Sequence, residues 1–164
     1  MSEASSASSS QHVLALALQE LPLCSLARVQ RVSRLWRAAA ADAFASLPCL
    51  DLRPHAPQLT DEVLSSLLAK TPGVHALNLS TCTRLTDQGL RPLPAACPAL
   101  SSLNLSCTHL SGPAVSLVVD SLGSRLQELE LAGCSSISEA ELVGRFSRFL
   151  ELDDDEDGLA KVQG

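Results

Sequence analysis

Six cysteines and four histidines are the residues of this chain that could bind a metal ion or form disulfides. They are Cys24, Cys49, Cys82, Cys97, Cys107 and Cys134, with His12, His55, His75 and His109. No two cysteines form the Cys-x-x-Cys pair of structural zinc sites, and the histidines fall at no ligand spacing. Buried free thiols behave as small apolar side chains. We therefore expect reduced cysteines in a core, with no metal and no cofactor.

Acidic residues beside hydroxyl residues could form a hydrolytic site, but here their positions indicate helix starts. Thr60-Asp61, Thr86-Asp87 and Ser138-Glu139 each place a hydroxyl directly before an acid, an order that caps a helix and suits its dipole. Ser138 and Glu141 also have the spacing of a capping box. No Ser/His/Asp, Cys/His or paired-carboxylate arrangement is left without such an explanation. We therefore expect no catalytic residues and no enzymatic activity.

The helix starts belong to a phrase that recurs every 26 residues. It runs Val74-x-x-Leu77-x-Leu79-x-x-Cys82-x-x-Leu85, then Leu100-x-x-Leu103-x-Leu105, then Leu126-x-x-Leu129-x-Leu131-x-x-Cys134-x-x-Ile137. A period of about 20–29 residues with this leucine core is typical of leucine-rich repeats. Aromatic residues are only 2% of the chain, and stacked repeats do not need them to fill a core. The sequence predicts an α/β leucine-rich-repeat solenoid of about 3.5 repeats.

The strand of each repeat should have one buried and one displayed side. Leu77 and Leu79 point inward and the residues between such leucines point out. We expect the concave face to display Asp51, Arg53, Asn78, Ser80, Asn104, Ser106, Glu128 and Glu130. This polar face lacks aromatic anchors, so it predicts weak recognition, with a basic segment near Glu128 and Glu130 as one partner. A neutral Asn78 and Asn104 ladder without a binding role is the other interpretation.

Composition divides the chain into four segments. Residues 1–11 are predicted to be disordered, 12–46 to form a helical domain, 47–150 the repeats and 151–164 an acidic tail. The helical domain is expected to have a single buried apolar stripe: Leu23, Leu26, Val29, Val32, Leu35 and Trp36. Neither a signal peptide nor a membrane span is expected, which predicts a cytoplasmic or nuclear protein. The net charge of −6 argues against nucleic-acid binding.

The segment from Leu21 to Arg37 resembles the F-box motif. Its pattern is Leu21-Pro22-Leu23-x-x-Leu26-x-Arg28-x-x-x-Val32-Ser33-Arg34-x-Trp36-Arg37. The sequence that follows, with Cys82-x-x-Leu85-Thr86-Asp87-x-Gly89-Leu90 and Cys97-Pro98-x-Leu100, is similar to the cysteine-containing repeats of F-box/leucine-rich-repeat proteins. An F-box directly before the repeats is also the arrangement of that family.

This resemblance implies a non-catalytic substrate-recognition subunit of a Skp–cullin–F-box ubiquitin ligase. In that family the F-box docks on a Skp-type adaptor, and through it on a cullin, while the repeats bind the substrate protein. The residues that the resemblance places toward the adaptor are Leu14, Leu16, Leu18, Leu21, Pro22, Leu23, Leu26, Val32 and Trp36. The usual Leu-Pro opening is missing near Ser9 and Ser10, and Ala17 replaces an expected Phe. The alternative is a leucine-rich-repeat interaction module whose degenerate F-box does not bind the adaptor.

Four arginines in the F-box-like segment share one helical face. Arg28, Arg31, Arg34 and Arg37 follow one another at steps of three residues. Such a row could contact an acidic adaptor or ligase partner. It could equally be the solvated side of a helix whose other side carries the apolar stripe.

Overall fold

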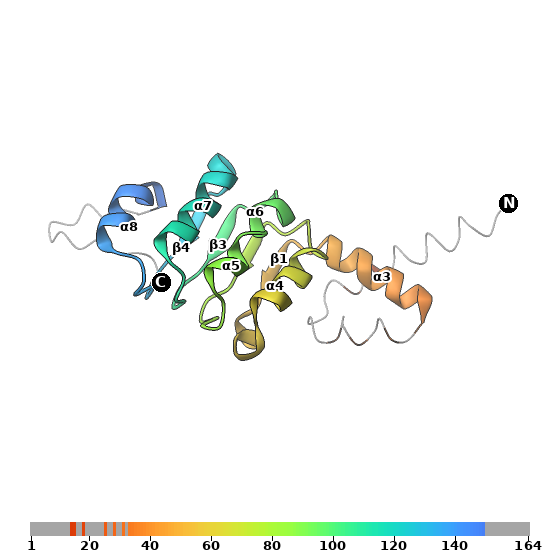
Figure 1. The fold of residues 1–164 in the computed structure, drawn as a ribbon. Helices are drawn as coiled ribbons and strands as arrows, with labels where there is room; N and C mark the ends of the chain where they lie inside the picture. The colour runs from red at the N-terminus through yellow and green to blue at the C-terminus, as the bar shows by residue number, and fades with distance from the viewer. Residues whose placement is uncertain are drawn as a thin grey trace, which may run out of the picture.

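The computed structural model of the chain describes residues 14, 15, 18, 25, 28, 31 and 33–149. These residues form a mixed structure in which a helix, α3 (Arg34–Ala45), precedes a four-stranded parallel sheet. In Figure 1, α3 extends from one side of the sheet, and the last helix of the described residues lies at the other side. The segment predicted to be disordered and the acidic tail lie outside the described residues.

The sheet is built from equivalent segments of the chain. Its strands are β1 (Cys49–Asp51), β2 (Ala76–Asn78), β3 (Ser102–Asn104) and β4 (Glu128–Glu130), paired in this order and all parallel. In the register, Leu77 lies beside Leu103 and Leu103 beside Leu129. The 26-residue period of the sequence therefore brings equivalent leucines together in space.

Helical segments connect the strands, as parallel pairing requires, and two further ones follow β4. Figure 1 shows the helices between the strands along one face of the sheet. The helical segments are η1 (Arg53–Gln58), α4 (Asp61–Leu68), α5 (Asp87–Leu90), α6 (Leu93–Ala96), α7 (Gly112–Leu122), η2 (Gly123–Arg125), α8 (Glu139–Arg145) and η3 (Ser147–Phe149). Leu77 of β2 and the neighbouring Leu79 share one continuous core with helix residues such as Leu64 and Val118. Burial of this leucine-rich surface is the main force that stabilises the sheet.

The cysteines divide between the core and the surface. Three are buried free thiols, namely Cys82, Cys97 and Cys134. Burial raises the pKa of Cys82 to about 11 and also raises the pKa of Cys97. Cys49 and Cys107 are exposed, so the expectation of a buried thiol is wrong for these two, and Cys24 lies outside the described residues.

Cys107 is exposed because, in the repeat that contains Leu103, a different residue occupies the position of the buried Cys82 and Cys134. Thr108, which is 1% exposed, lies 26 residues before Cys134. Its Oγ1 donates to the Leu105 carbonyl at 2.7 Å, and Cys134 Sγ donates to the same carbonyl at 3.1 Å. A hydroxyl and a thiol therefore satisfy the same backbone acceptor, and Cys107 is left at the turn before it.

The turns after β2, β3 and β4 each contain a left-handed residue. Thr81 has φ 62°, Cys107 has φ 57° and Gly133 has φ 71°, and these residues are 26 positions apart. The left-handed conformation lets the Thr81 N–H reach the Ser106 carbonyl at 2.9 Å. Only glycine adopts this conformation without a steric cost, so two of the three turns are strained.

The helical segment has a core of its own. Ser33 Oγ accepts a hydrogen bond from the Trp36 N–H at 3.3 Å and so caps α3. The buried residues of this second core are Ala15, Leu18, Ala39, Ala40, Ala43, Phe44 and Leu47, with Leu14 and Trp36 packed against them. Leu35 is 41% exposed, so its assignment to the buried stripe is wrong. Leu23, Leu26, Val29 and Val32 of that stripe lie outside the described residues.

Candidate functional site

The face of the sheet away from the helices, named here the outward face, displays two rows of side chains. The strand register aligns them as Cys49, Ala76, Ser102 and Glu128 in one row, and Asp51, Asn78, Asn104 and Glu130 in the other. All these residues except Glu128 line a shallow hollow of about 220 Å³. The hollow is open and has both polar and apolar lining, including Leu50 and Leu77. Its openness suits contact with another protein better than enclosure of a small molecule.

An ion pair occupies the β1 end of the outward face. Arg53 Nη2 lies 2.8 Å from Asp51 Oδ2, and the Arg53 backbone N–H also donates to this carboxylate at 3.1 Å. The side-chain hydrogen bonds from Arg53 lower the pKa of Asp51 below its usual value. The two side chains are 57% and 45% exposed, so the pair adds little stability. Its main effect is to neutralise the acid at this end.

The two asparagines of the outward face fold back on their own chain. Asn78 Oδ1 accepts from the Ser80 N–H at 3.0 Å, and Asn104 Oδ1 accepts from the Ser106 N–H at 2.9 Å. Asn104 Nδ2 also donates to Glu130 Oε2. These bonds are typical of Asx turns, so both amides have a structural role at the strand ends. For the side-chain oxygens of Asn78 and Asn104, this supports the interpretation that the two residues form a neutral ladder without a binding role.

Some of the residues predicted to be displayed on the concave face lie two positions away from the residues that the outward face displays. Ser80 is only 7% exposed, and Ser106 Oγ is buried without a partner among the described residues. The prediction that these serines are displayed is wrong, because both follow the strand end, where the asparagine turns the backbone. The outward positions that the sequence missed are Cys49, Ala76 and Ser102. The period could have found two of them, since Ser102 and Ala76 lie 26 and 52 residues before Glu128.

The acids at the helix starts bind the next repeat. Asp61 accepts from the Thr86 N–H at 2.9 Å and from its hydroxyl at 2.5 Å. Asp87 accepts in the same way from the Ser111 N–H at 2.9 Å and from its Oγ at 2.7 Å. These carboxylates therefore connect successive helix starts and are not free for catalysis.

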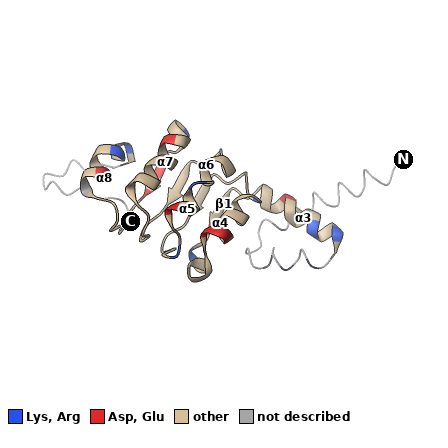
Figure 2. Cartoon of the chain, in the orientation of Figure 1, with Lys and Arg blue, Asp and Glu red and all other residues tan. Residues whose placement is uncertain are grey.

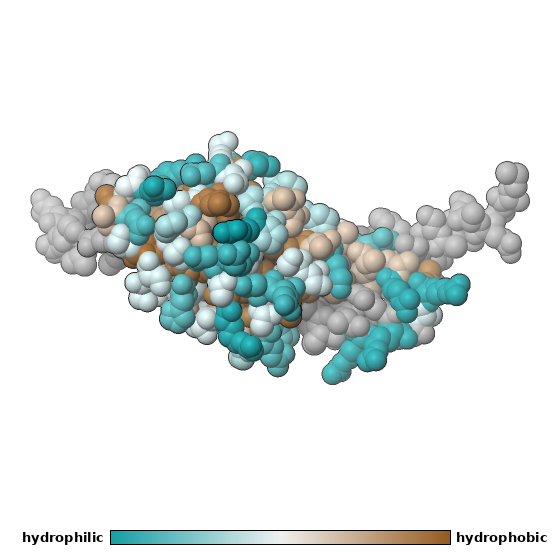
Figure 3. Space-filling view, viewed as in Figure 1, coloured by the Kyte–Doolittle hydropathy of each residue, from teal (hydrophilic) through white to brown (hydrophobic). Residues whose placement is uncertain are grey.

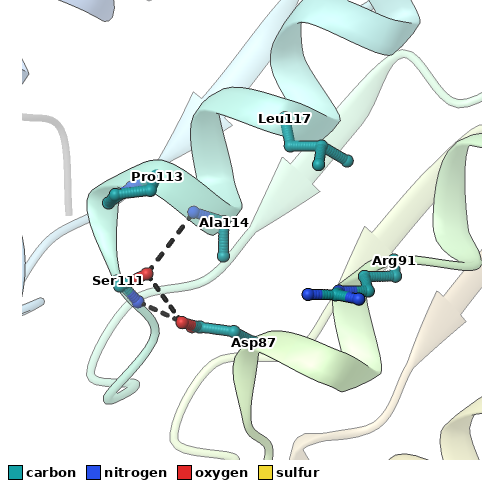
Figure 4. Close-up of a pocket in the computed structure, with 6 residues that line it drawn as sticks. All are labelled: Asp87, Arg91, Ser111, Pro113, Ala114 and Leu117. Carbon is teal, nitrogen blue, oxygen red and sulfur yellow. Dashed lines mark hydrogen bonds between the residues drawn. The ribbon is translucent and has the colours of Figure 1, made fainter.

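A second hollow, of about 200 Å³, lies between α5 and α7 on the helical face. Figure 4 shows Asp87 held by Ser111 at its rim, with Arg91 and Leu117 on opposite sides. Leu117 is 49% exposed, and Figure 3 shows an apolar patch over α7 among mostly polar side chains. The acid in this hollow is already hydrogen-bonded, so the hollow offers a basic group, Arg91, beside the apolar side chains of Pro113, Ala114 and Leu117.

The described residues of the predicted adaptor-binding set contribute to the helical core. Leu18 is 3% exposed, and Leu14 and Trp36 pack against the same core. The other members, Leu16, Leu21, Pro22, Leu23, Leu26 and Val32, lie outside the described residues. Leu35 is an exposed apolar residue in this segment that the sequence missed, because the three- and four-residue spacing assigned it to the buried side.

The four arginines of the helical segment are exposed. Figure 2 shows basic residues at the end of α3 that lies farthest from the sheet, and acidic residues on the helices beside the sheet. This exposure agrees with a partner contact and with a solvated face alike.

The described residues contain neither a candidate metal-binding cluster nor a candidate membrane-spanning helix. Within residues 33–149 and the six described residues before them, no group of three His, Cys, Asp or Glu side chains could hold a metal ion. No helix in these same ranges is long and apolar enough to cross a membrane.

Comparison with protein families gives one match. Residues 10–43 match the F-box domain, and this segment contains residues 34–43 of α3 and the described helical core residues that precede α3. F-box domains bind Skp-type adaptors and generally belong to non-catalytic substrate-recognition subunits. No curated protein matches the chain.

Proposed function

We propose that this chain is a non-catalytic substrate-recognition subunit of a Skp–cullin–F-box ubiquitin ligase, working in the cytoplasm or nucleus. Its F-box segment docks on a Skp-type adaptor and thereby reaches a cullin. The rest of the chain is a leucine-rich-repeat solenoid whose outward face binds the substrate protein. The observation that carries the proposal is the F-box match at residues 10–43, directly before a sheet built from repeated segments.

Three features of the sheet support the solenoid. The strands are parallel and follow one another in sequence order. From β2 onward, register partners are 26 residues apart, and helices α4, α5, α6 and α7 lie on the same face of the sheet. Stacking of this kind gives each repeat contacts only with its neighbours and leaves one extended face for binding.

A second candidate is the same solenoid with an F-box that no longer binds the adaptor. The observation that favours it is the position of Leu18, Leu14 and Trp36, which are engaged in the helical core. Under the first candidate, by contrast, adaptor binding would depend on Leu35 and on the residues outside the described set.

Adaptor binding distinguishes the two candidates. We expect the purified full chain to form a complex with a Skp-type adaptor on size-exclusion chromatography. Leu35→Asp, at an exposed position of the F-box segment, should weaken the complex at least about tenfold by calorimetry, as should Leu21→Asp and Leu26→Asp. Leu117→Asp, at an exposed leucine of α7, is the matched control and should bind normally. No complex at about 50 μM would overturn the first candidate.

A further inference from the structure

The edge of the sheet at β4 continues a series of backbone hydrogen bonds. The His75 carbonyl accepts from the N–H groups of Ser101 and Ser102, at 2.8 and 2.9 Å. The Ser101 carbonyl accepts in the same way from Gln127 and Glu128, at 2.8 and 3.0 Å. The Gln127 carbonyl is the next acceptor of this series, and no described residue donates to it.

A second series supplies donors at the same edge. Leu79 N–H donates to the Asn104 carbonyl, and Leu105 N–H donates to the Glu130 carbonyl, both at 2.9 Å. The equivalent donor of the last repeat is the Leu131 N–H, which has no acceptor among the described residues. The β4 edge therefore presents an acceptor and a donor with the spacing that bound the preceding strands.

The turn after β4 adds another donor. Cys107 N–H donates to the Ala132 carbonyl at 2.7 Å, and the equivalent N–H of Gly133 has no acceptor within the described residues. The core is also less covered here, since Leu129 is 6% exposed and Leu103 is 1% exposed.

The sequence does not place another leucine strand beside β4. The period continues to Leu152, but the residues 26 positions after Leu129 and Leu131 are Asp155 and Asp157. Charged side chains at these inward positions would be costly to bury. The pattern therefore predicts no further repeat from this segment.

We propose that the β4 edge binds an extended basic segment of a partner protein, which adds to the sheet as a strand. Glu128 is exposed and Glu130 half-buried on the outward face, and every second side chain of an added strand would lie beside them. Lysine or arginine at those positions meets two acids, with the acidic run 153–157 adding long-range attraction. A second copy would instead place Glu128 and Glu130 against acids of its own kind, which is unfavourable. Only the identification of this partner as the substrate of a ubiquitin ligase would rest on the proposed function.

The test uses the full chain and a fluorescent peptide of about ten residues that alternates lysine and valine. We expect saturable binding by anisotropy, with new hydrogen-exchange protection of the Leu131 and Gly133 amides. The double variant E128K/E130K should weaken binding at least about tenfold. The control E62K/D120K, with the same change in net charge at exposed helical residues, should bind within about twofold. A peptide with alternate backbone amides N-methylated keeps its charges but should lose binding.

Four results would overturn the proposal. The first is no binding of the lysine peptide at millimolar concentration, and the second is equal binding of its N-methylated form. The third is peptide binding without protection of the Leu131 and Gly133 amides. The fourth is a dimer of the chain that protects these amides in the absence of peptide. Adaptor binding is measured on the same samples and should not change in E128K/E130K. In the unsubstituted chain, absence of the adaptor complex would therefore count against the proposed ligase function, whereas absence of peptide binding alone would count against the edge.

Discussion

At the scale of single residues, burial divides the thiols by reactivity. The thiolate is the reactive form, and the raised pKa values of Cys82 and Cys97 keep these thiols protonated. At about pH 8 we expect iodoacetamide to modify the exposed Cys49 and Cys107 in the native protein and to leave Cys82 and Cys97 unmodified. Mass spectrometry of each cysteine peptide measures this. All of them should react in urea, and native Cys82 reacting as fast as Cys107 would contradict the buried position.

A single carboxylate provides a pH-dependent contribution to stability. The Ser138 N–H and Oγ donate to Glu141 Oε2 at 3.0 and 2.8 Å, and these bonds lower the pKa of Glu141 below its usual 4.5. A lowered folded pKa stabilises the protein above the unfolded pKa, and the contribution is lost as pH falls through the folded value. We therefore expect Glu141→Gln to lower the urea midpoint at about pH 7 but not at about pH 3.

The control for this prediction is Glu62→Gln, an exposed acid in the first turn of α4. Its effect should be smaller than that of Glu141→Gln at neutral pH, because no hydrogen bond joins Glu62 to its helix cap in the way that Glu141 binds Ser138. Equal deficits for Glu141→Gln at both pH values would show that the lost interaction does not involve the ionised carboxylate.

At the scale of elements, cross-repeat caps should stabilise the helix starts. Asp61 binds Thr86, and Asp87 binds Ser111, through two hydrogen bonds each. We expect Asp61→Ala and Asp87→Ala each to lower the free energy of unfolding by about 1–2 kcal/mol. Urea denaturation measures the change, and Glu62→Ala on α4 is the control. Effects no larger than that of the control would mean that these caps are replaced by water.

At one of the left-handed turns, by contrast, we expect a substitution that raises the stability of the protein. Thr81 carries a β-branched side chain at φ 62°, which costs about 1–2 kcal/mol, and some of this cost is offset by the greater freedom of glycine in the unfolded chain. Thr81→Gly should therefore raise stability by about 0.5–1 kcal/mol.

Gly133→Ala is the reverse change at the equivalent turn. Gly133 has φ 71°, and an added Cβ would lie 2.9 Å from Cys107 Sγ. The melting temperature of the Gly133→Ala variant should fall, whereas that of the Thr81→Gly variant should rise. A rise in both, or a fall in both, would contradict the assignment of strain to this position.

The sequence predicted the elements better than it predicted the outward face. Leucine spacing alone identified the strands, because a 26-residue period with one apolar side has few alternative packings. It could not show that Asn78 would bind the Ser80 N–H and so remove Ser80 from the surface. Nor could it show that Asp61 would reach across to Thr86. Both depend on side-chain conformations that spacing does not specify.

The same limit applied to the helical segment. Residue types at Leu21 to Trp36 suggested the F-box, and the family match at residues 10–43 supports that prediction. Which leucines face the core could not be predicted, because Leu18 is buried and Leu35 exposed although both fit an apolar period. A partner-binding face and a core face have the same composition in so small a domain.

At the scale of the whole molecule, the described residues form two cores with no residue in common, one under the sheet and one in the helical segment. Within the described residues, the two units approach each other where α3 ends. An added Cβ at Gly73 would lie 2.5 Å from the Ala45 carbonyl oxygen, so the end of α3 and the start of β2 are close. If each core is stable by itself, the proposed adaptor docking and the proposed substrate binding would depend on separate units.

Two core truncations test whether the units unfold independently. Leu103 in the sheet core is 1% exposed and Phe44 in the helical core is 4% exposed, so Leu103→Ala should cost about 2–5 kcal/mol and Phe44→Ala about 3–5 kcal/mol. If the units are independent, hydrogen exchange should accelerate only in β1–β4 for the first variant and only in α3 for the second. Adaptor binding should then be weakened by Phe44→Ala and retained by Leu103→Ala. Equal acceleration throughout the chain for both variants would mean that the contact between Ala45 and Gly73 joins the two cores into one cooperative unit.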